Sequence, residues 1–321
     1  MILTGMAVLG ISAAPVFAGE VHVIAMKGPT AMGMVQLMDE AENGALQDAG
    51  YSFEILASPD LVTPELVQGN ADIAALPANL ASVIYNNTDG GVQVLAINTL
   101  GILYIVDTSG EIQSVGDLKD KTIYASGKGA TPEYALDYVL RENGIDPETD
   151  VSIEWKSEHA ECLAALLADP EGIAMLPQPF VTTAQMKDDT INVALDLTQE
   201  WEKLQEGKEE TSALLTGVTV VRTAFAQEHP DEVAAFMEAY AASVDFVNNN
   251  TDEAAALVGG YDIVPEQVAK LALPACNITY IDGAEMKEML SGYLSVLFEQ
   301  NPQAAGGALP GDDFYYGVDA E

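Results

Sequence analysis

Two short motifs, one polar and one apolar, recur in this sequence, and the residue types in and after them suit the binding of a small polar molecule. Lys-Gly-x-Thr occupies residues 27–30 and again 128–131, and Ile-Ala-x-Leu-Pro occupies 73–77 and again 173–177. The copies therefore lie 101 and 100 residues apart. A repeat of this length matches a small domain rather than a solenoid unit, so the sequence predicts two similar lobes. Clefts between domains commonly bind small molecules.

Each Lys-Gly-x-Thr motif is expected between a strand and a helix, where the backbone N–H groups of the first helical turn have no partner. Glycine lets a ligand approach the backbone closely, threonine suits the helix start, and lysine adds positive charge. Such a loop favours a carboxylate, sulfonate, phosphate or heteroaromatic edge. The alternative is helix capping without a ligand. We predict ligand contacts from Lys27, Thr30, Lys128 and Thr131.

Further polar residues are expected where strands end at the same cleft. Asn79 and Gln178 follow the two Leu-Pro corners, and their amides can donate and accept hydrogen bonds. The alternative is that either amide caps its own backbone. Asn98 and His159 are expected to fix the ligand's orientation. The complete predicted set is Lys27, Thr30, Ser58, Asn79, Asn98, Ser126, Lys128, Thr131, His159, Gln178 and Thr219.

Aromatic side chains near strand ends are a second source of affinity, because they stack on flat ligands. Ordinary core packing is the alternative. These residues are Tyr104, Tyr124, Trp155 and Phe180.

Catalytic and metal-binding patterns are missing from the sequence. The cluster Lys156–Cys162 contains His159, but its spacing matches no common zinc pattern, and Ser157 with Glu161 fits a helix start better. Walker, dinucleotide and Gly-x-Ser-x-Gly patterns are also missing. We therefore predict a protein without a cofactor or metal, and not an enzyme.

Charge and composition restrict the class of protein and its possible partners further. Fifty acidic against 12 basic residues give a formal charge of −38, which disfavours nucleic acids and anionic membranes as partners. A hydrophobic content of 49% provides for real cores. The only cysteines, Cys162 and Cys276, are expected in different lobes as free buried thiols.

Apolar runs alternate with helical patterns, which predicts an α/β fold of two Rossmann-like lobes with mainly parallel sheets and a ligand cleft between them. Residues 1–18 form an apolar segment ending in Val-Phe-Ala, which predicts a cleaved signal peptide; the alternative is a buried first helix. Lobe 1 is expected at 19–105 and 218–321, and lobe 2 at 106–217. The hinge strands are expected near 103–106 and 214–220. After 230 the chain is expected to be mainly helical to Gln300, with an acidic, glycine-rich tail from 301.

Several segments resemble the type 2 periplasmic binding proteins of ABC importers, in the branch named for nitrate, sulfonate and thiamine-precursor uptake. Residues 115–123 resemble that family's step into the second lobe and 126–140 its following loop and helix, while 69–74 resemble its Gly-x-x-Asp-Ile-Ala strand entry and 220–231 its return segment. The resemblance implies a Venus-flytrap fold, a ligand captured between the lobes, and delivery to a membrane permease with its ATPase.

The expected function is thus that of an extracytoplasmic, monomeric solute-binding protein for a heteroaromatic, organic-acid or sulfonate-type molecule. The resemblance leaves an enzyme alternative, the menaquinone-pathway group, which shares the fold and converts a chorismate-derived substrate. The predicted signal peptide argues against that group, because its members work in the cytoplasm. The cysteine-rich motif of thiamine-pyrimidine synthases is also missing.

Overall fold

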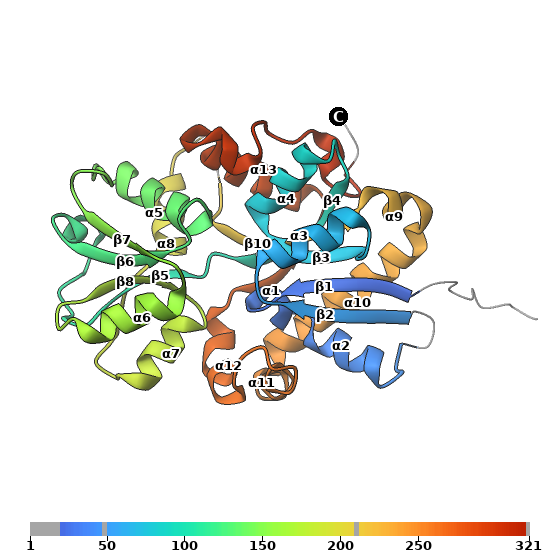
Figure 1. The fold of residues 1–321 in the computed structure, drawn as a ribbon, viewed down its shortest axis with the longest axis horizontal. Helices are drawn as coiled ribbons and strands as arrows, with labels where there is room; N and C mark the ends of the chain where they lie inside the picture. Colours follow the sequence, from blue (N-terminus) through green and yellow to red (C-terminus); the bar gives the residue numbers. More distant parts are fainter. Residues whose placement is uncertain (1–19, 47–49, 209–211, 319–321) are drawn as a thin grey trace, which may run out of the picture.

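The computed structural model describes residues 20–46, 50–208 and 212–318, which form two lobes lying side by side (Figure 1). The first lobe contains a six-stranded sheet in the order β11-β4-β10-β3-β1-β2, and the second a five-stranded sheet in the order β7-β6-β8-β5-β9. The strands are β1 (Glu20–Met26), β2 (Gly50–Leu56), β3 (Ile73–Pro77), β4 (Val92–Leu100), β5 (Leu103–Asp107), β6 (Thr122–Ser126), β7 (Ser152–Lys156), β8 (Ile173–Pro177), β9 (Asn192–Asp196), β10 (Leu215–Arg222) and β11 (Ile278–Ile281).

Most strands of each sheet run in one direction. β1 is parallel to β2 and β3, and β10 is antiparallel to both β3 and β4, so β1 to β4 share one direction. In the second sheet β6 is parallel to β7 and β8, and only β5 runs against its neighbours. The predicted α/β fold with two mainly parallel sheets is therefore confirmed.

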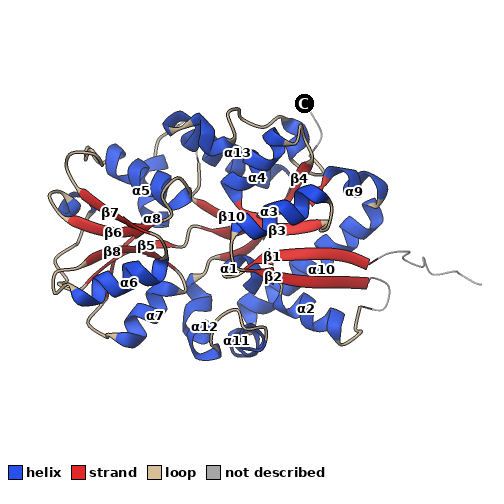
Figure 2. Cartoon of the chain, in the orientation of Figure 1, coloured by secondary structure: helices blue, strands red, loops and turns tan. Residues whose placement is uncertain are grey.

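Helices cover both faces of each sheet (Figure 2), as expected for sheets with strands buried on both sides. They are α1 (Pro29–Met32), α2 (Val35–Glu42), α3 (Pro59–Gln68), α4 (Ala78–Asn87), α5 (Thr131–Glu142), α6 (His159–Ala168), α7 (Phe180–Lys187), α8 (Leu197–Gln205), α9 (Thr223–Glu228), α10 (Pro230–Asn249), α11 (Thr251–Gly260), α12 (Glu266–Ala272) and α13 (Gly283–Gln300). Short 3₁₀ turns occur at Val115–Leu118, Leu273–Ala275, Pro302–Ala305 and Asp312–Phe314.

Residues of β10 show how the sheet separates two cores. Val218 and Val220 pack into a cluster with α4 and α13, whereas Val221 packs with α2 and α10 on the opposite face. Successive side chains of a strand point to opposite faces, so a continuous apolar run supplies both cores. The buried position of β10 explains its β-branched composition.

The chain changes sheet twice, at residues that differ from the predicted lobe limits. β4 ends at Leu100 and β5 begins at Leu103, so β5 lies wholly in the second sheet instead of dividing at 105. The return runs from the end of α8 at Gln205 to Leu215, and all of β10 lies in the first sheet. At the first crossing, apolar strands on both sides left no mark of the boundary in the sequence.

Other differences have local causes. The helical segment after β1 is divided into α1 and α2, because the Gly33 carbonyl accepts a hydrogen bond from Ser243 Oγ at 2.8 Å. Ser243 Oγ also accepts from the Leu37 N–H at 3.2 Å, which fixes α2 separately. The strands β9 and β11 were not predicted. Residues 301–318 pack on the first lobe, where Phe314 is fully buried.

Two sequence predictions concern termini and cysteines. The predicted signal peptide, residues 1–18, lies outside the described residues. Within 20–46, 50–208 and 212–318, none of the helices combines the length and apolar content needed to span a bilayer. Cys162 and Cys276 are free and buried, as predicted, and burial raises the pKa of the Cys276 thiol to about 12.

Candidate functional site

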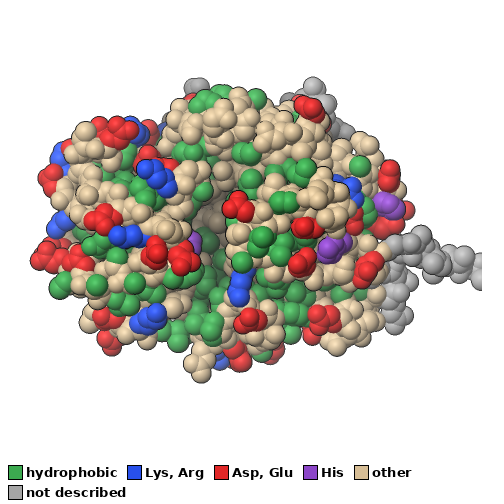
Figure 3. Space-filling model, viewed as in Figure 1, with side chains coloured by type: hydrophobic (Ala, Val, Ile, Leu, Met, Phe, Trp, Pro, Cys, Tyr) green, Lys and Arg blue, Asp and Glu red, His purple; other side chains and the backbone are tan. Residues whose placement is uncertain are grey.

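The carboxyl ends of the parallel strands in the two lobes face each other. β4 runs in the same direction as β1 to β3 and leads directly into the second lobe, so all four point toward it. β5 starts at the first lobe, so its antiparallel neighbour β8 and the parallel strands β6 and β7 end there. A hollow lies between the lobes on the face seen in Figure 3. Ligands of α/β proteins bind outside such strand ends.

The two Lys-Gly-x-Thr motifs occupy equivalent turns between a strand and a helix. Gly28 (φ 128°) and Gly129 (φ 79°) adopt left-handed conformations that favour glycine. Lys128 is exposed, and Lys27 is half exposed with its Nζ 3.9 Å from an exposed Asp262 carboxylate. Both ammonium groups thus lie at the surface, where water screens their charge.

The threonines of these motifs do not cap their helices, which corrects the capping alternative. Thr30 and Thr131 lie inside α1 and α5, after Gly28 and Ala130, the residues in the cap positions. Thr30 Oγ1 donates to the Met26 carbonyl at 2.6 Å and is buried.

Thr131 joins the two lobes. Its Oγ1 lies 2.7 Å from the hydroxyl of Tyr293, on α13, and 3.4 Å from Oδ1 of Asn79, on α4. Tyr293 is fully buried, and burial raises the pKa of its hydroxyl. Two predicted site residues from opposite lobes therefore contact each other through hydroxyl and amide groups.

Ser126 and His159 form a second pair of predicted residues, entirely within lobe 2. Ser126 Oγ, at the end of β6, lies 2.6 Å from Nδ1 of His159, at the start of α6. The His159 ring packs against Phe180 at a centroid distance of 5.1 Å. Burial lowers the pKa of His159, which favours a neutral imidazole at pH 7.

Gln178 and Ser58 lie at helix starts beside strand ends. Gln178 Oε1 accepts from the N–H and hydroxyl of Thr182, so this amide does cap its own helix. The Gln178 N–H donates to the carbonyl of Ile102, in the crossing between the lobes, at 3.0 Å. Ser58 occupies the cap position of α3, is half-buried, and makes no capping bond with its side chain.

Asn98 and Thr219 lie in the interior of the first sheet. Asn98 Nδ2 donates to Thr219 Oγ1 at 3.0 Å, and both residues are fully buried. The Asn98 carbonyl oxygen accepts from the Thr99 hydroxyl at 2.9 Å. The polar groups of Asn98, Thr99 and Thr219 thus form hydrogen bonds with one another close to Gly217. In this structure they stabilise the first sheet and do not line the cleft.

Tyr293 and Tyr104 link the two lobes, a role that the sequence analysis did not predict for either residue. Tyr293 belongs to an amphipathic helix in which a tyrosine is ordinary core, and its partner Thr131 lies 162 positions away. Tyr104 was considered as a stacking residue, but its hydroxyl donates to the Ala275 carbonyl at 3.1 Å and thereby links the lobes.

The electrostatic character of the strand ends comes from the backbone as well as the side chains. α4, α5, α6 and α7 all begin at these ends, and the partial positive charge at a helix N-terminus favours anions. Among the described residues no cluster of His, Cys, Asp or Glu has the arrangement of a metal site. The site therefore offers hydroxyl, amide, imidazole and backbone N–H groups.

Sequence comparison places these observations in a family. The profile described as "ABC transporter, phosphonate, periplasmic substrate-binding protein" matches residues 41–257. The chain belongs to this family. It is an ABC transporter substrate-binding protein, and the family to which it belongs is periplasmic. No protein with a curated function matches the sequence significantly.

Solved structures of other binding proteins share the fold of this substrate-binding protein. An ABC transporter protein from Parabacteroides distasonis superposes with a TM-score of 0.76 at 23% identity, covering 92% of this chain and 98% of that one. The aliphatic sulphonate binding protein SsuA from Escherichia coli gives 0.71 at 14% identity, with coverage of 92% and 95%. The alkanesulfonate-binding SsuA from Xanthomonas axonopodis pv. citri, bound to MOPS, gives 0.65 at 14% identity, with coverage of 94% and 96%.

Proposed function

We propose that this substrate-binding protein captures a small organic anion, of the sulfonate or organic-acid type, between its lobes. Helices from both lobes direct their N-termini to the strand ends, and four of the predicted residues there, Asn79, Ser126, Thr131 and His159, carry no formal negative charge. The proposal rests on this arrangement of helix N-termini and uncharged hydrogen-bond donors, because both stabilise a bound anion. The sulfonate ligands of fold relatives agree with this chemistry.

The Ser126–His159 pair is the proposed recognition element for the anionic oxygen. When the Ser126 hydroxyl donates to Nδ1, the neutral ring carries its proton on Nε2 and can donate it to the ligand. In the other tautomer, Nδ1–H donates to Ser126 and frees the hydroxyl proton instead. Either arrangement offers one donor. Phe180 beside the imidazole supplies an apolar surface for the organic part of the ligand.

The remaining expectations follow the family. We propose a monomer outside the cytoplasm, exported by the signal peptide predicted at 1–18, that delivers its ligand to a permease with its ATPase. Lobe closure would be stabilised by contacts between lobes, of which Thr131–Tyr293 and Tyr104–Ala275 are present in this structure. A binding role predicts that the ligand is released unchanged, whereas the menaquinone-type enzyme would convert it.

The test is a thermal-shift screen of residues 19–321 against alkyl and aryl sulfonates, aromatic acids, thiamine precursors and riboflavin, followed by calorimetry on the hits. A true ligand raises the melting temperature with concentration. Ser126→Ala should then weaken binding at least about ten-fold, because a hydrogen bond to a charged group contributes about 1.5–3 kcal/mol and each 1.4 kcal/mol changes the affinity about ten-fold. Ser152→Ala, an exposed serine at the opposite end of the neighbouring strand, is the matched control.

The outcome that contradicts the site assignment is equal affinity of Ser126→Ala and the parent protein. A hit confined to uncharged compounds would contradict the proposed ligand class, and recovery of a chemically altered compound would contradict the binding role.

A further inference from the structure

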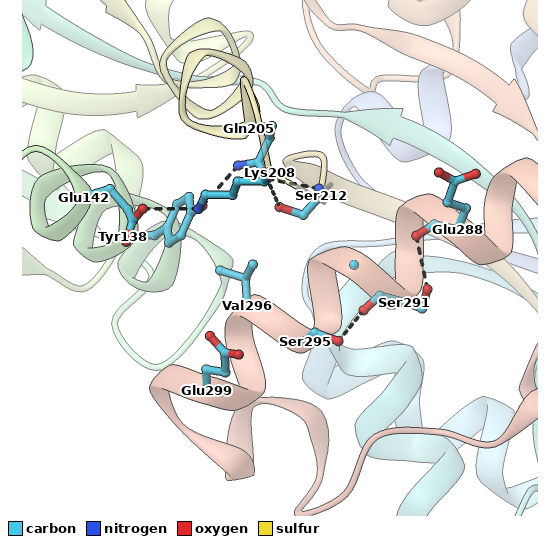
Figure 4. A pocket seen from close by; sticks show the side chains of 11 residues that line it. Tyr138, Glu142, Gln205, Lys208, Ser212, Glu288, Ser291, Ser295, Val296 and Glu299 are labelled. Carbon is cyan, nitrogen blue, oxygen red and sulfur yellow. Dashed lines mark hydrogen bonds and ion pairs between the residues drawn. The ribbon is translucent and has the colours of Figure 1, made fainter. Parts of the chain in front are cut away.

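A cavity of about 610 Å³ lies away from the strand ends, on the seam between lobe 2 and α13 (Figure 4). One wall comes from α5, the end of α8, and the two residues Lys208 and Ser212. The other is a single face of α13, which also packs against β4 of the first lobe. The lining residues are Tyr138, Glu142, Gln205, Lys208, Ser212, Glu288, Ser291, Gly292, Ser295, Val296 and Glu299.

The wall from lobe 2 already holds an ammonium group of the protein itself. Lys208 Nζ donates to the Tyr138 hydroxyl at 2.9 Å and to the Glu142 carboxylate at 3.2 Å. It also lies 5.3 Å from the centre of the Tyr138 ring, within cation–π range. The bond to Tyr138 and the attraction of Glu142 raise the pKa of Lys208, so it stays charged. Glu142 therefore offsets the positive charge of Lys208 within the cavity wall itself.

The α13 wall has two further carboxylates. Glu288 and Glu299 are exposed to the cavity, and neither forms an ion pair with any described residue. They are eleven residues apart, which places them on one helix face about 16 Å from each other. Between them the face presents serine hydroxyls, Gly292 and the apolar Val296. This order of charge, small or apolar surface, and charge matches an alkyl chain with an ammonium at each end.

We propose that the cavity binds an extended polyammonium molecule, with its ends at Glu288 and Glu299 and its methylene chain along Gly292 and Val296. Hydroxyls of Ser291 and Ser295 lie along the same path, where they can accept from a secondary ammonium. A molecule held here contacts lobe 2 on one side and α13 on the other. By linkage, its binding changes whenever the relative position of these two parts changes.

The test uses spermine with the whole mature chain, by isothermal calorimetry at fixed ionic strength. The variant Glu288→Gln with Glu299→Gln should weaken spermine binding about ten-fold, because it removes both exposed ion pairs proposed for the ends of the ligand. The control, Glu238→Gln with Glu253→Gln, removes the same charge from exposed positions on α10 and α11, outside the cavity, and should leave the affinity within two-fold of the parent value.

Since the protein carries a net charge of −38, general attraction of cations is the competing explanation. Equal weakening in both double variants would overturn the proposal in favour of that attraction. So would a melting-temperature rise with Mg²⁺ equal to that with spermine at matched charge. Melting of both variants without spermine at the parent temperature shows that the comparison concerns binding rather than folding.

Discussion

The hydrogen bond between Thr131 and Tyr293 gives the sharpest quantitative prediction, because it joins a lobe 2 helix to α13 inside a buried contact. Thr131 is 6% exposed and Tyr293 is fully buried, with 2.7 Å between their hydroxyl oxygens. Thr131→Val keeps the shape of the side chain but removes its hydroxyl. The Tyr293 hydroxyl then loses its partner, and Asn79 Oδ1 loses its 3.4 Å contact.

The expected cost follows from these burials. A buried hydroxyl left without a partner costs about 1–3 kcal/mol, and the Asn79 contact is too long to add much. We expect Thr131→Val to lower the free energy of unfolding by about 2 kcal/mol. Tyr293→Phe should cost about 1 kcal/mol, since the Thr131 hydroxyl keeps Asn79 as its partner.

A double-mutant cycle measured by urea unfolding checks the reasoning. The variant with both substitutions should lose about as much as Thr131→Val alone, because both single changes remove the same bond, which gives a coupling energy of about 1 kcal/mol. Thr183→Val, whose half-buried hydroxyl bonds only to the Pro179 carbonyl within its own turn, should show no coupling to Tyr293→Phe. Additivity of the Thr131 and Tyr293 effects within about 0.3 kcal/mol would refute the assigned bond.

Two further predictions concern packing and pH. Gly217→Ala should lower the free energy of unfolding by about 1–3 kcal/mol, because the added Cβ would clash with Asn98 and lie 2.6 Å from Thr30 Cγ2. The control, Gly260→Ala, has open space around the added Cβ and should not lower it. Equal effects of the two substitutions in urea unfolding would contradict the steric argument. Asp137→Asn should stabilise by about 1.5 kcal/mol at pH 7 but not at pH 4. Burial and the nearby Glu133 raise the Asp137 pKa from 3.8 to about 6, so the folded state binds the extra proton and stability falls as pH rises from about 4 through 6. The rise of the pKa from 3.8 to about 6 corresponds to about 3 kcal/mol, and solvent screening at this half-buried position reduces that free energy by about half. An equal stabilisation by Asp137→Asn at pH 4 and pH 7, measured by urea unfolding, would contradict this prediction.

The strand and helix order could be predicted because each local signal agreed with the fold. Residues 122–126 and 173–177 are short apolar runs followed by turn residues, and both are strands. β11, by contrast, reads Ile-Thr-Tyr-Ile, which favours a strand, but it has only four residues and lies between helical segments, so its shortness hides it. The break between α1 and α2 depends on Ser243, which lies 210 positions from Gly33. No local pattern contains such a contact.

The candidate site was predictable to the same extent. Knowing that parallel strands end at one edge was enough to select Ser126 and His159, which bond to each other. The same rule could not distinguish this pair from Asn98 and Thr219, which lie inside the sheet and form a hydrogen bond with each other. That difference depends on the depth of each residue in the sheet, and fully buried polar pairs have the same residue types as ligand contacts.

The position of β10 sets the order in which the polypeptide can fold. This strand lies between β3 and β4 in the middle of the first sheet, although it follows the whole of lobe 2 in the chain. Until residue 222 is available, β3 and β4 each have an unpaired edge and their shared core lacks Val218 and Val220. Lobe 2, continuous from β5 to α8, has all its strands earlier. A growing chain therefore completes its second lobe first, and the first lobe stays open until most of the protein has been made.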